Sequence, residues 1–197
     1  LITLILTPFY AHSVEVSGNF TLGSDYIWRG VSQKGGAAMS AGIEAEQNGW
    51  YTGVWASQVD YGDNSDYEYD FYTGFSYDIN DELAIDVGVI QYNYDGDLES
   101  VEELFVVMNY SWASFGFWFD QDNSNSDYTQ IEVSLPFITF ADVTLRHGEF
   151  SDDSSYNQIT FSKDLGNKFT LALEVVSEES VKIDLEDRIA FTLRYTF

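Results

Sequence analysis

Apolar and polar residues alternate strictly along residues 187–197. One parity is wholly apolar, with Ile189, Phe191, Leu193, Tyr195 and Phe197, and the other carries Arg188, Ala190, Thr192, Arg194 and Thr196. A period of two places these sets on opposite faces of one extended strand. An alternating strand that finishes on an aromatic residue is typical of a sheet closed into a barrel, where both edges of each strand are paired.

The same alternation recurs along the chain and predicts twelve strands. They lie near residues 14–22, 39–46, 50–59, 67–78, 83–89, 104–112, 115–119, 129–135, 143–146, 159–161, 169–175 and 187–197, and the parity of the first continues through Tyr26 and Trp28. Long acidic connections alternate with short turns such as Asn48-Gly49, a pair that favours a tight hairpin. Twelve is an even number, as single-chain bacterial barrels require. The sequence therefore predicts an all-β fold, a transmembrane up-and-down antiparallel β-barrel of twelve strands.

The apolar face is predicted to point outward, into lipid. Its strand centres are nearly free of charge, and a lysine or arginine there would cost about 2–4 kcal/mol. Aromatic residues gather near strand ends, where interfacial girdles lie, and these are Tyr26, Trp28, Trp50, Tyr67, Tyr77, Tyr92, Tyr94, Tyr110, Trp112, Tyr156 and Tyr195. We therefore expect a protein of the bacterial outer membrane, in contact with its lipid and lipopolysaccharide.

Residues 1–13 hold the one long apolar run of the sequence, which is too short to span a bilayer as a helix. Pro8 and the small residues Ala11 and Ser13 resemble the end of a secretory signal peptide. A first buried strand is the alternative, but Pro8 and the lack of alternation disfavour it. We expect a residual signal peptide over 1–13 and the barrel over 14–197.

The sequence has 33 acidic residues against 8 lysines and arginines, a formal net charge of −25. Binding to nucleic acid needs a basic surface, so this function class is excluded. Because 45% of the residues are hydrophobic, the charge does not indicate disorder. The sequence has no cysteine, which excludes disulfides and thiolate chemistry, and we expect no cofactor.

Three stretches carry a family resemblance. They are Ser24–Gln33 (SDYIWRGVSQ), Gly49–Ser57 (GWYTGVWAS) and Asp86–Tyr94 (DVGVIQYNY), the first being the most specific. They resemble the TorF family, proteobacterial proteins named as porins, and the likeness extends over essentially all of 14–197. The resemblance implies an outer-membrane barrel and says more about location than about mechanism.

The polar face supplies candidate residues for the barrel lumen. The acids on this face are Glu15, Glu44, Glu46, Glu68, Asp70, Asp78, Asp86, Glu132 and Glu174, and the bases are Arg29, Arg146, Arg188 and Arg194. We single out Arg29, Glu44, Glu46, Asp70, Asp86, Glu132, Arg146, Glu174, Arg188 and Arg194 as pore-lining candidates. An excess of carboxylates favours cations in a narrow aqueous pore. A plugged interior, in which arginines and carboxylates pair across the lumen, is the alternative, because twelve strands lie between filled and open barrels.

The long connections are themselves acidic. Their acids are Asp60, Asp63, Asp66, Asp95, Asp97, Glu99, Asp120, Asp122, Asp127, Asp152, Asp153, Glu178 and Glu179. Oxygen ligands suit Ca²⁺ or Mg²⁺, so the external loops could hold divalent cations, but 120–124 lacks the glycine and distal glutamate of a calcium loop. A solvated acidic surface is the simpler interpretation, and we assign no metal site.

The remaining expectations concern catalysis, binding partners and function. His147 is the one histidine outside the predicted signal peptide, no catalytic motif surrounds it, and we expect no enzyme. The strand that ends in Phe197 resembles the last strand of bacterial outer-membrane β-barrels, and this resemblance implies that the barrel-insertion machinery reads it. It should pair with the first strand. The function predicted is a narrow, cation-preferring porin for passive passage of small solutes or ions. The alternative is a closed structural or adhesive barrel with divalent-binding loops.

Overall fold

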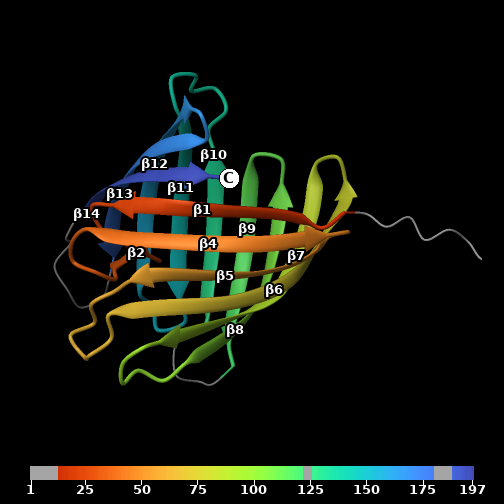
Figure 1. The fold of residues 1–197 in the computed structure, drawn as a ribbon. Coiled ribbons are helices and arrows are strands. Elements are labelled where there is room, and N and C mark those ends of the chain that lie inside the picture. The colour runs from red at the N-terminus through yellow and green to blue at the C-terminus, as the bar shows by residue number, and fades with distance from the viewer. Residues whose placement is uncertain (1–12, 122–125, 180–187) are drawn as a thin grey trace, which may run out of the picture.

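A computed structural model describes residues 13–121, 126–179 and 188–197, and within these ranges twelve strands form one closed antiparallel barrel (Figure 1). The wall strands are β1 (Glu15–Gly23), β4 (Ala38–Gln47), β5 (Trp50–Gln58), β6 (Tyr67–Asn80), β7 (Leu83–Tyr94), β8 (Val101–Tyr110), β9 (Ala113–Asp120), β10 (Tyr128–Ser134), β11 (Asp142–Phe150), β12 (Ser155–Gly166), β13 (Phe169–Glu179) and β14 (Arg188–Thr196). Two further short strands, β2 (Ile27–Trp28) and β3 (Val31–Ser32), pair only with each other. Among the described residues, no helix is long and apolar enough to cross a membrane.

Each wall strand pairs with its neighbours in the chain, and β1 closes the ring by pairing with both β4 and β14. The closing register places Phe20 opposite Tyr195 and Thr21 opposite Arg194. The main chain of Gly18 also exchanges hydrogen bonds of 3.2 and 3.0 Å with that of Phe197. The predicted all-β class, the twelve-stranded antiparallel barrel and the pairing of the first strand with the last are confirmed.

Side chains divide by parity between the two faces of the wall. On β6, Tyr69 and Phe71 are 39% and 53% exposed, whereas Glu68 and Asp70 are 3% and 6% exposed. Because the exposed set is apolar and the buried set is charged, the barrel has the inverse of a soluble protein's arrangement, and its outer surface is suited to lipid. On β14, Arg194 Nε lies 3.4 Å from Thr21 Oγ1, on the inner face as predicted.

The connections 24–37, 59–66, 95–100 and 151–154 lie at one end of the barrel, the loop end. The turns 48–49, 81–82, 111–112 and 167–168 and the connection 135–141 lie at the other, the turn end. Several loop acids accept hydrogen bonds from nearby backbone N–H groups, as Asp63 does from Ser65 and Asp152 from Ser154. Asp95 Oδ1 accepts from both Asp66 N and Tyr67 N. These acids stabilise turns, a usual role of aspartate. Of the sequence predictions, residues 1–12 of the signal peptide, Asp122 and the connection 180–187 lie outside the described residues.

Two expectations are wrong. The parity of the first strand does not continue through Tyr26 and Trp28, because β1 ends at Gly23 and the chain then leaves the wall. Five aromatic residues assigned to the girdles do not face lipid but belong to the interior, and they are Tyr26, Trp28, Tyr92, Tyr94 and Tyr156. Tyrosine and tryptophan suit a membrane interface and a polar interior equally, so residue type alone could not separate them.

Candidate functional site

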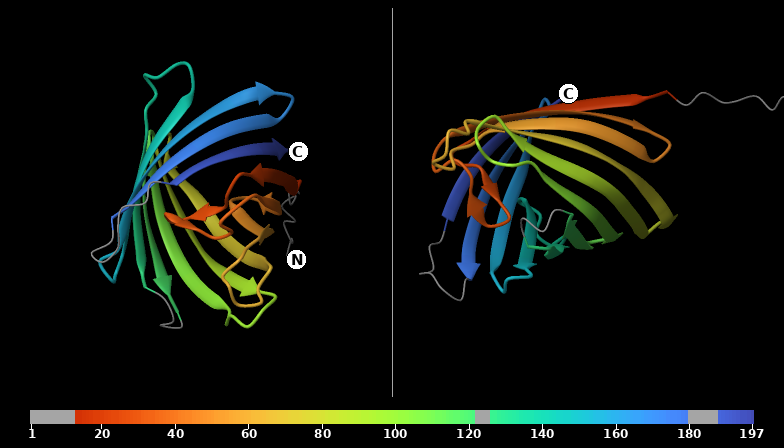
Figure 2. Two further views of the ribbon diagram at one scale, coloured as in Figure 1. Left: turned by 90° about the vertical axis from the view of Figure 1, so that its left-hand side faces the viewer. Right: turned by 90° about the horizontal axis from the view of Figure 1, so that it is seen from below.

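The connection between β1 and β4, residues 24–37, folds into the barrel, and we call it the inner loop. Figure 2 shows its hairpin of β2 and β3, in orange, within the ring of strands. Two residues per strand cannot form a stable hairpin alone, so the hairpin depends on what it packs against. Ile27 packs against a buried cluster of Tyr128, Tyr156 and Val176 on β10, β12 and β13.

The hairpin turns through Arg29 and Gly30, whose φ angles are +46° and +87°. Positive φ at both central residues is the geometry of a type I′ turn, which matches the twist of antiparallel strands. Gly30 also lies so close to the wall that a Cβ there would meet the ring of Tyr156 at 2.6 Å. Glycine is therefore required at this position for two reasons, and Arg29 is held in a conformation that non-glycine residues rarely adopt.

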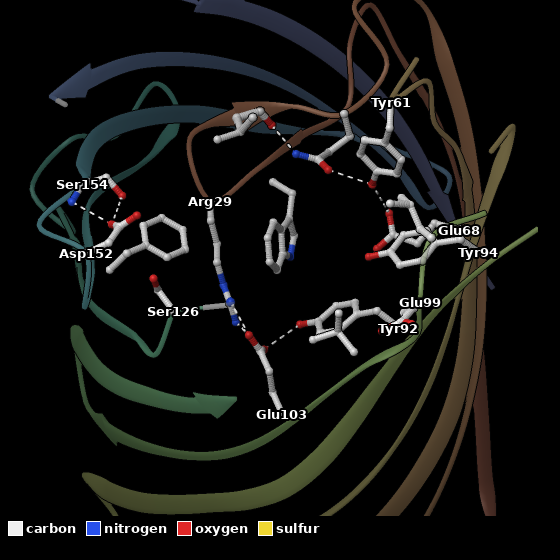
Figure 3. Close-up of a pocket in the computed structure, with 16 residues that line it drawn as sticks. Arg29, Tyr61, Glu68, Tyr92, Tyr94, Glu99, Glu103, Ser126, Asp152 and Ser154 are labelled. Carbon is white, nitrogen blue, oxygen red and sulfur yellow. Dashed lines mark hydrogen bonds and ion pairs between the residues drawn. The ribbon is translucent and has the colours of Figure 1, made fainter. Parts of the chain in front are cut away.

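The turn places the Arg29 side chain across the lumen onto Glu103 of β8. Arg29 Nη1 and Nη2 donate to the two carboxylate oxygens of Glu103 at 2.6 and 2.7 Å (Figure 3). The Arg29 guanidinium carbon also lies 4.3, 5.3 and 4.1 Å from the ring centres of Trp28, Trp118 and Tyr128. A guanidinium that combines a bidentate carboxylate with aromatic faces is firmly held.

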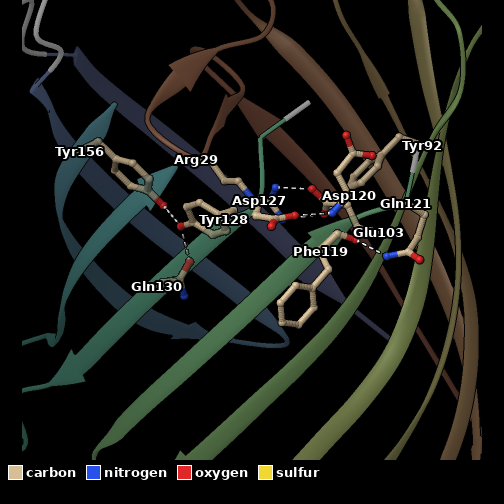
Figure 4. A network of polar contacts seen from close by, with 10 residues as sticks. All are labelled: Arg29, Tyr92, Glu103, Phe119, Asp120, Gln121, Asp127, Tyr128, Gln130 and Tyr156. Carbon is tan, nitrogen blue, oxygen red and sulfur yellow. Dashed lines mark hydrogen bonds and ion pairs between the residues drawn. The ribbon is translucent and has the colours of Figure 1, made fainter. Parts of the chain in front are cut away.

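Burial of Arg29 by itself lowers its pKa. The hydrogen bonds to Glu103 and the electrostatic effects of Tyr92, Glu103 and Tyr128 together outweigh burial, so the pKa of Arg29 lies above its ordinary value. Glu103 is 2% exposed and also accepts a hydrogen bond of 3.0 Å from Tyr92 Oη. The Tyr128 ring, which Arg29 contacts, has a hydroxyl that lies 2.6 Å from the Tyr156 hydroxyl and donates a hydrogen bond to Gln130 Oε1 (Figure 4). We call Trp28, Arg29, Tyr92 and Glu103 the neck, because they narrow the lumen where the inner loop crosses it.

The inner loop is also tied to the wall at the loop end. Tyr61 Oη donates to Gln33 Oε1 at 2.8 Å, Lys34 Nζ donates to Val59 O at 3.1 Å, and Asp60 N donates to Gln33 O at 2.8 Å. Burial, followed by the charge of Glu68, raises the pKa of Tyr61. The connection 59–66 therefore fixes the second half of the inner loop, and the hairpin is held at both ends.

A cavity of about 680 Å³ opens at the loop-end side of the neck, and we call it the loop-end chamber (Figure 3). It is lined by Trp28, Arg29, Val31, Gln33, Tyr61, Glu68, Tyr92, Tyr94, Leu98, Glu99, Val101, Glu103, Ser126, Phe150, Asp152 and Ser154. Aromatic rings and carboxylates dominate this lining. Its size is that of a small-molecule binding cavity.

Two smaller cavities of the lumen bring other predicted residues together. One, of about 430 Å³, is lined by Glu44, Tyr51, Tyr72, Asp86, Ile90, Phe105 and Trp118, and we call it the turn-end chamber. In it, Tyr51 Oη donates to Asp86 Oδ1 at 2.7 Å. The other, of about 150 Å³, has Glu174 and Arg194 in its lining.

The ten predicted pore-lining residues all lie on the inner face or the inner loop. Glu44, Glu46, Asp70 and Asp86 belong to β4, β6 and β7, whereas Arg146, Arg188 and Arg194 belong to β11 and β14, with Glu132 on β10 and Glu174 on β13. Arg146 Nη2 and Glu132 Oε2 form an ion pair of 2.6 Å. Arg29 lies in the hairpin turn rather than on a wall strand. Acids therefore line β4–β8, and the wall arginines lie across the lumen on β11–β14.

Sequence reasoning missed Glu103 and misplaced Tyr92, both part of the neck. The parity of Leu104 and Val106, which are exposed to the outside, already implies that Glu103 points inward. His147 lies on the outer face, exposed, with Nδ1 3.0 Å from Asn157 Oδ1. It is thus remote from the lumen, and no group of three or more metal-ligating side chains is found within the described ranges.

Comparison with known proteins gives a family and a fold. Residues 10–192 match the family described as "Bacterial protein of unknown function (Gcw_chp)". Among solved structures, the KdgM porin is 9% identical, with a TM-score of 0.67 over 92% of this chain and 99% of that one. The COG4313 outer membrane channel from Pseudomonas putida F1 is 9% identical, with a TM-score of 0.56 over 97% of this chain and 98% of that one. No curated protein matches the sequence significantly.

Proposed function

The chain belongs to the Gcw_chp family of bacterial proteins, whose description states no function, and we propose that it is a porin of the bacterial outer membrane. It allows passive passage of small solutes or ions and prefers cations. The outer surface supports the location, because exposed apolar side chains cover the wall and both edges of every wall strand are paired. Two structural neighbours that are covered almost in full, titled as a porin and as an outer membrane channel, share this fold.

The observation that carries the cation preference is the lining of the two chambers. Glu68, Glu99, Glu103 and Asp152 line the loop-end chamber, and Arg29 is the one basic residue in that lining. Since Arg29 is already neutralised by Glu103, the chamber as a whole is negative. Glu44 and Asp86 line the turn-end chamber, which has no basic residue. A permeating ion would therefore meet carboxylates on both sides of the neck, an arrangement that favours positive charge.

The neck itself supports the second candidate, a closed structural or adhesive barrel. Arg29 and Glu103 are 7% and 3% exposed at their side chains, so the inner loop fills much of the lumen where they meet. A solute could pass through a lumen filled in this way only if the inner loop moved. In the closed candidate, the acidic loops would contact divalent ions or a surface partner instead.

Tracer uptake separates the two candidates. Purified protein is reconstituted into liposomes, and entry of radiolabelled rubidium and radiolabelled chloride is compared with entry into protein-free liposomes. The porin predicts uptake above the protein-free background, with rubidium entering faster than chloride. Uptake of both ions at background would favour the closed barrel, and faster entry of chloride would refute the cation preference.

A further inference from the structure

Two buried carboxyl groups beside the neck have no basic partner among the residues that the structure describes. Glu68 and Asp70 are successive inward-facing residues of β6, 3% and 6% exposed, and their carboxyl groups contact each other. Glu68 Oε2 lies 3.1 Å from Tyr61 Oη, whose one hydrogen it shares with Gln33 Oε1, whereas Asp70 Oδ1 is buried without a hydrogen-bond partner among the described residues. Arg29 is paired with Glu103, and Arg146 with Glu132. Two carboxylates so placed require a positive charge, either a proton or a bound cation.

The space in front of these carboxyls is built from aromatic rings. Glu68 lines the loop-end chamber together with Trp28, Tyr61, Tyr92 and Tyr94. Tyr61 and Tyr94 meet edge to face with ring centres 5.6 Å apart, and Trp28 and Tyr92 do so at 5.5 Å. Figure 3 shows Tyr61, Tyr94 and Glu68 close together on one side of the chamber. Aromatic faces attract cations that have lost part of their water.

The protein's own Arg29 shows how this lumen holds an organic cation. Its guanidinium is bound by one carboxylate and lies 4.1–5.3 Å from three ring centres. Glu68 and Asp70, with Tyr61 and Tyr94 beside them, repeat this combination without a cation of the protein. The chamber thus offers a second site of the same chemical kind, open to the solvent of the loop end.

A metal ion fits this site less well than an organic cation does. Calcium takes six to eight oxygen ligands, and no group of three metal-ligating side chains occurs among the residues described. Next to Glu68, the chamber wall includes the rings of Tyr61 and Tyr94. We propose that the loop-end chamber binds a small organic cation with an alkylammonium or guanidinium head group. Its charge lies against Glu68, which lines the chamber, with the buried Asp70 next to Glu68 on β6 but outside that lining, and its apolar part lies on Tyr61, Tyr94 and Trp28. This inference rests on the proposed porin and names the class of solute that it favours.

Calorimetric titration of the full chain in detergent micelles with choline tests the site. The matched control ligand is the uncharged analogue in which carbon replaces the quaternary nitrogen, because it has the same shape without the charge. We expect choline to bind and the analogue to bind at least about tenfold more weakly, since aromatic cages recognise quaternary ammonium by its charge. Equal binding of the two ligands, or no binding of choline, overturns the proposal and shows that the carboxyl pair holds a proton instead.

Variants locate the site. The double substitution Glu68→Gln with Asp70→Asn should weaken choline binding at least about tenfold, since it removes both charges at nearly constant volume. Tyr94→Leu should weaken it about three- to thirtyfold, and Tyr94→Phe should leave it unchanged, because a cation contacts the ring and not the hydroxyl. Asp81→Asn with Glu82→Gln, in the exposed turn between β6 and β7, also removes two charges, so it is the charge-matched control and should bind as the parent chain does.

Binding by the Glu68→Gln, Asp70→Asn variant at parental strength would also overturn the proposal, once circular dichroism shows that the barrel is folded. The two proposals fail separately. Rubidium uptake without choline binding refutes only the organic-cation site. Choline binding without tracer uptake refutes only the porin and leaves a binding barrel.

Discussion

Arg29 and Glu103 meet across the lumen through two hydrogen bonds of 2.6 and 2.7 Å, although 74 residues separate them in the sequence. This ion pair joins the turn of the inner loop to β8, and both side chains are almost fully buried. It also neutralises Arg29, a basic residue in the lining of the loop-end chamber. The pair therefore holds the inner loop in the lumen and affects the charge of the path that the porin requires.

Removing the Arg29 charge should destabilise the barrel and release the inner loop. Breaking a buried ion pair by deleting one partner costs about 3–5 kcal/mol, so Arg29→Gln should lower the free energy of unfolding in urea and raise single-channel conductance. Arg146→Gln is the matched control, because its pair with Glu132 is 34% and 28% exposed and should be worth less. The Arg29→Gln, Glu103→Gln double variant should recover part of the loss. Equal losses from Arg29→Gln and Arg146→Gln would contradict the role of the neck.

Gly30 should be the least replaceable glycine of the inner loop. Gly30→Ala combines a positive φ with a clash against Tyr156, and we expect a loss of about 1–3 kcal/mol in the free energy of unfolding. Gly35 also has a positive φ, +66°, but a Cβ there meets nothing within 4 Å. Gly35→Ala therefore isolates the backbone strain and should cost less. The same loss at both positions would show that Gly30 is not pressed against the wall.

The two faces of β8 should differ sharply in their tolerance of charge. Val106 is outward and 41% exposed, so Val106→Arg should cost about 2–4 kcal/mol in a lipid bilayer. Val107 faces the polar lumen and lies opposite Asp86 of β7, whose carboxylate can pair with a guanidinium. Val107→Arg should therefore be much better tolerated in urea unfolding from lipid vesicles. Greater damage from Val107→Arg would contradict the inside-out assignment.

Phe197 should matter for assembly in the outer membrane. Its backbone pairs with Gly18, and a Cβ on Gly18 would meet the Phe197 ring at 2.4 Å, so the aromatic side chain covers the seam between β1 and β14. We propose that the insertion machinery reads this strand, and Phe197→Ala should lower the heat-modifiable, folded fraction in outer membranes several-fold. Phe137→Ala changes an aromatic residue that is 76% exposed in a turn and serves as the control. Parental assembly of Phe197→Ala would refute the role of this residue.

Alternation alone was sufficient to predict the wall. Each wall strand buries one face and exposes the other, so a period of two marks the strand and separates its two faces. The lack of charge at the strand centres of the apolar face then indicates which face meets lipid. Thus Arg194 could be assigned to the interior and β1 could be paired with β14 before any coordinates. The outward-facing residues of β6 were predicted in the same way.

The neck could not be predicted, because the residues that form it leave no periodic pattern in the sequence. Tyr26 and Trp28 continue the parity of β1, so the pattern does not show that the chain leaves the wall after Gly23. The partner of Arg29 is distant in sequence, and Glu103 lies opposite the hairpin because the strands close into a barrel. One local clue was present, since a two-residue Arg-Gly turn between Trp28 and Val31 is consistent with a hairpin.

The reversal potential of the current through planar bilayers, with a salt gradient across the membrane, tests the central claim most directly. Because carboxylates line both chambers, the account predicts a conductance whose reversal potential has the sign of cation selectivity. It also predicts that Glu44→Gln with Asp86→Asn moves this potential toward zero. Absence of conductance, or a reversal potential of the opposite sign, would contradict the account.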